Sequence, residues 1–235
     1  MKRSLSFVKT YARTALSSRW GAPVLAVLLL LLLSWLSSRL SSAIIFSNVN
    51  GFTTLSGYIV AFIFLLLLDI LSAGLTAMGL TLLRGEKASA GEILSAFKNH
   101  PDRFLIAGLL KFLAAALYLL PLFLVFRASG LGSTLKLVLL LIWGIAGGLL
   151  LIRFYLSWSF VRPLLLEDSS LSSLEAFRQS SAMTRGQLLR LFGFELSFLG
   201  WYLLGLLSLG LGFLWIIPYV ATSRVALYLS VSEGR

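Results

Sequence analysis

Residues 57–83 read GYIVAFIFLLLLDILSAGLTAMGLTLL, and Asp69 is the single charged residue in this stretch. A helix needs about 20 mainly apolar residues to cross a bilayer. The stretch therefore predicts a transmembrane helix, and it is long enough to tilt or to project from the membrane. This one segment already favours a membrane protein.

The rest of the chain has the same character. Hydrophobic residues make up 58% of the 235 residues, charged residues 12%, and the mean hydropathy is +0.94. A soluble domain carries about 25% charged residues, so this chain has too few to cover a water-facing surface. We expect an all-α, polytopic transmembrane helical bundle with six spans, at about 21–38, 57–83, 104–126, 136–161, 187–207 and 212–231.

Residues 1–20 predict an amphipathic helix, because Val8, Ala12 and Leu16 recur at helical spacing. Such a helix lies in the membrane interface with its apolar side toward lipid; a basic leader without this structure is the alternative. We therefore expect an interfacial helix over 1–20 and a transmembrane domain over 21–235. Arg39 follows the leucine-rich run closely, which favours an uncleaved first span over a signal peptide.

Two links between spans resemble this first helix. Residues 91–98 and 172–184 are short amphipathic stretches, and the second begins with serines that can cap a helix. The pattern predicts further interfacial helices. Either the chain contains three copies of one unit, a helix followed by a hairpin, or basic amphipathic helices simply look alike.

Basic residues predict the orientation. They gather in the N-terminal segment, which includes Lys2 and Arg3, and in links 84–103 and 162–190, whereas link 208–211 has no charge. The positive-inside rule then places both termini in the cytoplasm. Aromatic residues should mark the two interfaces: Trp20 and Trp158 the inner one, and Trp35, Tyr58 and Trp215 the outer one.

Charges inside apolar spans are costly and need partners or water. Four of them share one depth, roughly 10–12 Å below the inner edge at about 1.5 Å rise per residue: Lys111, Arg153, Glu195 and Arg224. We expect a polar layer in which Glu195 pairs with Arg153 or Arg224. Asp69, nearer the midplane, takes the remaining arginine or a water-filled cavity.

These residues also have plainer interpretations. Lys111 can extend its long side chain to the interface, and a Glu–Arg pair can fix helix register without any transport. Asp69 can be a functional group or a hydrogen-bonded core residue. In the fourth span Gly144 and Gly148 form GxxxG, which predicts close helix packing.

Catalytic and metal motifs are missing from the sequence. It has one histidine, His100, in a link beside Pro101, and no cysteine. These residues cannot build a zinc motif, a Cys–His pair or a conventional triad. We expect no catalytic residue, no metal and no cofactor. The net charge of +11 falls at the ends of apolar runs rather than in a basic stripe, so we expect no nucleic-acid partner.

Residues 192–228 read FGFELSFLGWYLLGLLSLGLGFLWIIPYVATSRVALY. This stretch resembles the DUF975 family of bacterial integral membrane proteins, although Leu199 and Leu211 stand where the family pattern has Ile. It is also similar to the membrane domain found beside some glycerophosphodiester phosphodiesterases. The matching residues are Leu196, Ser197, Phe198, Gly200, Trp201, Gly210, Gly212, Leu214, Trp215, Pro218, Tyr219 and Tyr228. The resemblance implies a multi-pass inner-membrane protein and no particular substrate.

Two functions remain open on these grounds. The first is a non-enzymatic accessory or scaffold protein that binds membrane lipids, another membrane protein or a second copy of the chain. The alternative is a small transporter or channel-like protein, with the polar layer of Asp69, Arg153, Glu195 and Arg224 lining its path. An intramembrane enzyme built on the two carboxylates has no motif to support it.

Overall fold

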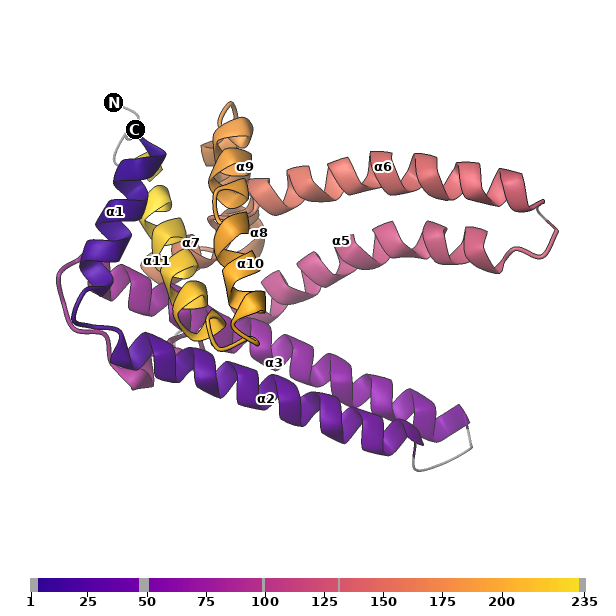
Figure 1. Cartoon of the computed structure of the whole chain (residues 1–235), viewed down its shortest axis with the longest axis horizontal. Helices are drawn as coiled ribbons and strands as arrows, with labels where there is room; N and C mark the ends of the chain where they lie inside the picture. The colour runs from indigo at the N-terminus through magenta and orange to yellow at the C-terminus, as the bar shows by residue number, and fades with distance from the viewer. Residues whose placement is uncertain (1–3, 47–50, 99, 131, 233–235) are drawn as a thin grey trace.

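The computed structural model describes residues 4–46, 51–98, 100–130 and 132–232. These residues form helices joined by short links, so the all-α prediction is confirmed (Figure 1). Lys2 and Arg3 lie outside the described residues. Six helical segments of the described chain are long and apolar enough to cross a membrane, as predicted: Gly21–Phe46, Thr54–Leu83, Pro101–Arg127, Ser133–Glu167, Leu188–Leu207 and Phe213–Ser232.

Two long helical hairpins dominate the molecule. The first joins α2 (Gly21–Phe46) to α3 (Gly51–Leu83), and the second joins α5 (Pro101–Arg127) to α6 (Ser133–Ser157). The hairpins lie close together at one end and diverge toward their tips (Figure 1). We call the end where they meet the base.

The first span is longer than predicted. The helix continues through Arg39, whose guanidinium carbon lies 5.9 Å from the centre of the Trp35 ring. Both side chains are exposed. A long cationic side chain near the end of a membrane helix can reach the interface, so Arg39 does not stop the helix.

Two predicted spans are broken helices. The fourth ends at Ser157 and continues, after a turn, as α7 (Val161–Glu167). The fifth is divided at Ser197 and Phe198 into α9 (Leu188–Leu196) and α10 (Leu199–Leu207). Pro163 lies in the first turn of α7, where a proline costs no hydrogen bond. Hydropathy runs straight through both breaks and therefore gave each span as one helix.

The links at the base contain the other short helices. Residues 90–98 form the 3-10 helix η1 (Ala90–Leu94) and α4 (Ser95–Lys98). Residues 173–184 form α8 (Ser173–Thr184), and the Ser172 side chain accepts a hydrogen bond from the Glu175 amide. The predicted capping serine and the predicted helix in this link are both confirmed.

The N-terminal helix α1 (Leu5–Leu16) packs on protein along its apolar side. Val8, Ala12 and Leu16 are at most 1% exposed, and Val8 and Ala12 belong to the main hydrophobic core. Tyr11 donates a hydrogen bond of 2.7 Å to the Leu83 carbonyl at the end of α3. We expected this apolar side to face lipid; it is instead covered by the chain itself.

The last helix, α11 (Phe213–Ser232), lies across the base. Figure 1 shows α9, α10 and α11 running across the two long hairpins rather than along them. Helix α11 is also far more buried than α5. Of the 18 most apolar consecutive residues, 61% are buried in α11 and none in α5. The base is therefore the packed part of the molecule, and the hairpins extend from it.

Candidate functional site

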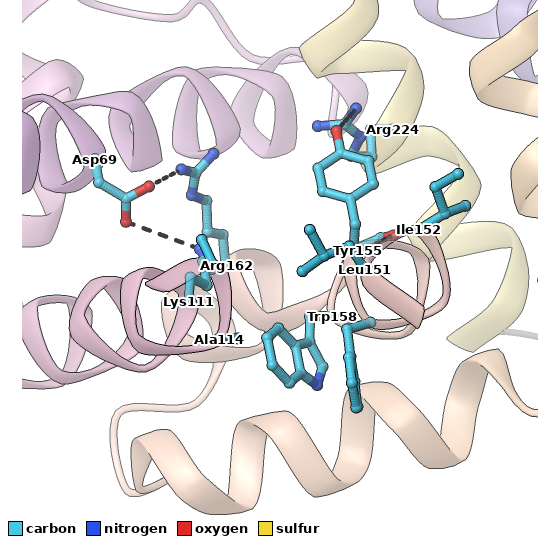
Figure 2. Close-up of a pocket in the computed structure, with 12 residues that line it drawn as sticks. Asp69, Lys111, Ala114, Leu151, Ile152, Tyr155, Trp158, Arg162 and Arg224 are labelled. Carbon is cyan, nitrogen blue, oxygen red and sulfur yellow. Dashed lines mark hydrogen bonds and ion pairs between the residues drawn. The ribbon is translucent and has the colours of Figure 1, made fainter. Parts of the chain in front are cut away.

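Asp69 lies on α3 near the base, facing two cations. Its carboxylate accepts a hydrogen bond from the Arg162 guanidinium, and its other oxygen lies 3.8 Å from the Lys111 ammonium nitrogen. Figure 2 shows the two cations converging on the carboxylate. The three side chains are 24–29% exposed. Asp69 thus has two positively charged partners, neither of them an arginine of the predicted layer.

Sequence reasoning missed Arg162, because it was counted in a cytoplasmic link. After the turn that follows Ser157, α7 packs against α3 and α5, and this brings Arg162 to Asp69. Pro163 was the available signal, since a proline inside an apolar run predicts a helix end just before it. Lys111 contacts Asp69, so its side chain is directed into the protein rather than to the interface.

Glu195 pairs with Arg224, one of its two predicted partners. The Glu195 Oε1 accepts hydrogen bonds from Arg224 Nη2 at 2.7 Å and from Nε at 3.1 Å. Arg224 Nη2 also donates to the Tyr155 hydroxyl at 3.0 Å. This pair joins α9 to α11 across the base.

Arg153 does not join the cluster. Its side chain is exposed, and no ion pair involves it in the described part of the chain. Residues two positions apart on a helix point roughly 200° apart, so Arg153 faces away from the site when Tyr155 faces it. The predicted polar layer is therefore formed without Arg153 and with Arg162.

A cavity of about 530 Å3 opens beside Asp69 (Figure 2). One part of its wall is charged and the other part is apolar or aromatic. Its lining consists of Asp69, Lys111, Ala114, Ala115, Leu151, Ile152, Phe154, Tyr155, Trp158, Ser159, Arg162 and Arg224. Three cationic side chains line it against one carboxylate. Arg162 Nε is buried and has no hydrogen-bond partner among the described residues.

A second cavity, of about 260 Å3, adjoins the first. Its lining shares Tyr155, Ser159, Arg162 and Arg224 with the first cavity. It extends toward α3 and α11, where Thr76 and Ser72 add hydroxyl groups.

The close glycine contact predicted for α6 occurs at Gly147, one residue before Gly148. Gly144 has open space around it, and Gly148 meets only the Tyr118 hydroxyl, at 3.9 Å from a built Cβ. Gly147 instead packs on Tyr118 of α5, whose ring would lie 2.6 Å from a Cβ there. The closest α5–α6 approach is therefore at Gly147, while at the GxxxG residues the Tyr118 hydroxyl donates a long hydrogen bond of 3.4 Å to the Gly144 carbonyl.

No candidate metal site occurs in the described part of the chain. Within it, no group of three or more His, Asp or Glu residues is placed to hold a metal ion. His100 is exposed and stands before α5 with a left-handed φ of 57°. Pro101 occupies the first position of that helix, as expected from its missing amide hydrogen.

Comparisons with known proteins add a family and no activity. Neither a curated protein nor a solved structure matches the chain. One family model, described as "Protein of unknown function (DUF975)", matches residues 1–235. The resemblance that appeared in residues 192–228 thus extends over the whole sequence, and the chain belongs to the DUF975 family.

Proposed function

We propose that this protein is a non-enzymatic accessory protein of the bacterial inner membrane, with cytoplasmic termini, and that it binds an anionic membrane lipid. The cavity beside Asp69 holds the acidic headgroup. The observation that carries the proposal is the surplus of positive charge around this cavity. Lys111, Arg162 and Arg224 stand against Asp69, and one positive charge remains after Glu195 is counted with Arg224.

An uncompensated cation is costly at membrane depth. A lipid phosphate or carboxylate beside Lys111 and Arg162 lowers that cost, because it supplies the missing negative charge and accepts charge-assisted hydrogen bonds. The Arg162 Nε has an unused donor for such a bond. The charged part of the cavity thus matches an acidic group better than a neutral or cationic one.

The apolar wall matches the other half of a lipid. Ala114, Ala115, Leu151 and Ile152 line the cavity on α5 and α6, and these two helices expose most of their apolar side chains. An acyl chain can therefore leave the cavity along the surface that faces the bilayer. A small polar solute would leave this wall without a partner.

A binding titration tests the proposal. The purified protein should bind phosphatidylglycerol more tightly than the zwitterionic phosphatidylethanolamine. Lys111→Gln should weaken binding of the anionic lipid about tenfold, roughly 1.4 kcal/mol, because it removes one cation and leaves the Asp69–Arg162 pair. Lys87→Gln, at an exposed position of the inner link, is the matched control and should bind as the wild type does. Equal affinity for both lipids would argue against the proposal.

A small transporter is the second candidate, and the two adjoining cavities favour it. They share Arg162 and Arg224 and bring polar side chains into one row beside Asp69. If solute or ion flux occurs in proteoliposomes, Asp69→Asn should abolish it. Absence of flux over a panel of ions and solutes, together with lipid binding, would leave the accessory function.

A further inference from the structure

The link between α10 and α11 ends in exposed leucines. Leu207, Leu209 and Leu211 are 79%, 94% and 66% exposed. No charged residue occurs between Glu195 and Arg224. The link between α5 and α6 is different, since Arg127 and Lys136 flank it. A link that emerges into water at the far side of a membrane has no reason to present only leucine, serine and glycine.

The beginning of α11 lies beside the beginning of α2. Trp215, in the first turn of α11, and Trp201, on α10, line a cavity of about 210 Å3 together with Trp20 and Arg13. Trp20 directly precedes α2. Trp20 was expected at the inner interface and Trp215 at the outer one; because they share a cavity, the two residues cannot lie on opposite sides of the membrane.

Core packing gives the depth of this end of α11. Leu214 and Ile217 pack against the hydrophobic cluster that contains Ala26 and Val27. Val27 lies roughly 9 Å from the start of α2, at about 1.5 Å rise per residue. Leu71, the cluster member farthest from the end of α3, lies roughly 18 Å from that end. The hydrocarbon is about 30 Å thick, so α11 begins between roughly one third and three fifths of the way through it, well short of the far side.

The other end of α11 lies at the same side. The Tyr228 hydroxyl donates a hydrogen bond of 2.6 Å to Glu167 at the end of α7. Between the two ends, Thr222 and Val225 lie against Gly79, close to the end of α3. Both ends and the middle of α11 therefore contact the base, which agrees with its position across the hairpins in Figure 1.

We infer that the third hairpin, α9–α10 with α11, does not cross the bilayer, and that the Leu207–Leu211 tip is seated among the acyl chains of the leaflet that contains the base. Its partner is the hydrocarbon of that leaflet. The two long hairpins then make the four crossings, and both termini remain on one side. The inference does not depend on what the cavity beside Asp69 binds.

The absence of cysteine from the chain makes single-cysteine labelling direct. Three variants suffice: Leu209→Cys at the tip, Ser129→Cys in the α5–α6 link, and Ser169→Cys in the exposed link at the base. Each is treated in oriented vesicles with a membrane-impermeant maleimide from one side and then from the other. Ser129→Cys and Ser169→Cys should react from opposite sides, and Leu209→Cys from neither, because a thiol in hydrocarbon does not ionise to the reactive thiolate.

Fluorescence quenching distinguishes a thiol in lipid from one that is merely blocked. A fluorophore attached at Leu209→Cys in detergent and then reconstituted should be quenched by lipids brominated on the acyl chain and not by aqueous iodide. Labelling of Leu209→Cys from the side on which Ser129→Cys reacts would overturn the inference, since the hairpin would then cross. Iodide quenching from the base side would overturn the insertion of the tip.

Discussion

Asp69 and Glu195 lie inside apolar helices, and each carboxylate faces an arginine from a helix remote in the sequence. Asp69 on α3 meets Arg162 on α7, and Glu195 on α9 meets Arg224 on α11. Removing one member of a buried ion pair leaves the other charge without compensation, which costs more than the pair itself contributes. These pairs therefore fix which helices meet at the base.

Glu195→Gln should destabilise the protein by about 2 kcal/mol, below the range of about 3–5 kcal/mol for fully buried pairs because both side chains keep some exposure. The amide cannot neutralise Arg224, whose side chain is only 27% exposed. Thermal unfolding in detergent measures the effect. The matched control is Glu175→Gln. The Glu175 carboxylate lies 3.9 Å from Arg178 in an exposed pair, so its loss should change the stability little. Equal changes in melting temperature for both variants would show that the Glu195–Arg224 pair stabilises the protein no more than an exposed pair does.

Gly108 brings the α5 backbone close to the site. A Cβ at this position would lie 3.2 Å from Asp69 Oδ2, whereas a Cβ at Gly193 has open space. An alanine in a helix gains up to about 1 kcal/mol over glycine. Gly193→Ala should therefore raise the melting temperature. Gly108→Ala should lose that gain and displace the Asp69 carboxylate. A similar rise for the two variants would mean that Asp69 has more room than the contact implies.

At the scale of the helices, the sequence predicted the features that depend on local hydropathy and on the residues at helix ends. The number of apolar segments and the capped helix α8 both follow from local residues. The breaks in the fourth and fifth spans do not, because tertiary contacts decide whether an apolar run stays one straight helix. Arg162 reached Asp69 only through such a break.

The long α5–α6 hairpin is closely packed around Tyr118. Gly147 leaves room for the Tyr118 ring, and Trp143 Nε1 donates a hydrogen bond of 3.0 Å to the Tyr118 carbonyl. Gly147→Leu should force α5 and α6 apart, since the ring would lie 2.6 Å from even a Cβ. Spin labels on the two helices should then report a longer distance. Gly144→Leu, at an open position of the same helix, should leave the distance unchanged; an unchanged distance in both would contradict the packing described here.

At the scale of the whole molecule, the base holds the core, the two ion-paired carboxylates and the cavities, while the long hairpins expose apolar surface. The sequence predicted a polar layer at this level from Lys111, Arg153, Glu195 and Arg224, and the structure leaves Arg153 out of it. It could not predict that α11 lies across the base, because the length and apolarity of a segment do not give its direction. The cavity beside Asp69 is lined by residues of α3, α5, α6, α7 and α11, so it lies where these helices meet.

The lipid that remains with the protein after purification tests the central claim most directly. Wild-type protein extracted in mild detergent, without added lipid, should retain about one anionic lipid per chain, and Lys111→Gln should retain less while Lys87→Gln retains as much as the wild type. Quantitative lipid analysis by mass spectrometry provides the ratio. A retained lipid mixture with the composition of the bulk membrane, the same in all three proteins, would contradict an anionic lipid site beside Asp69.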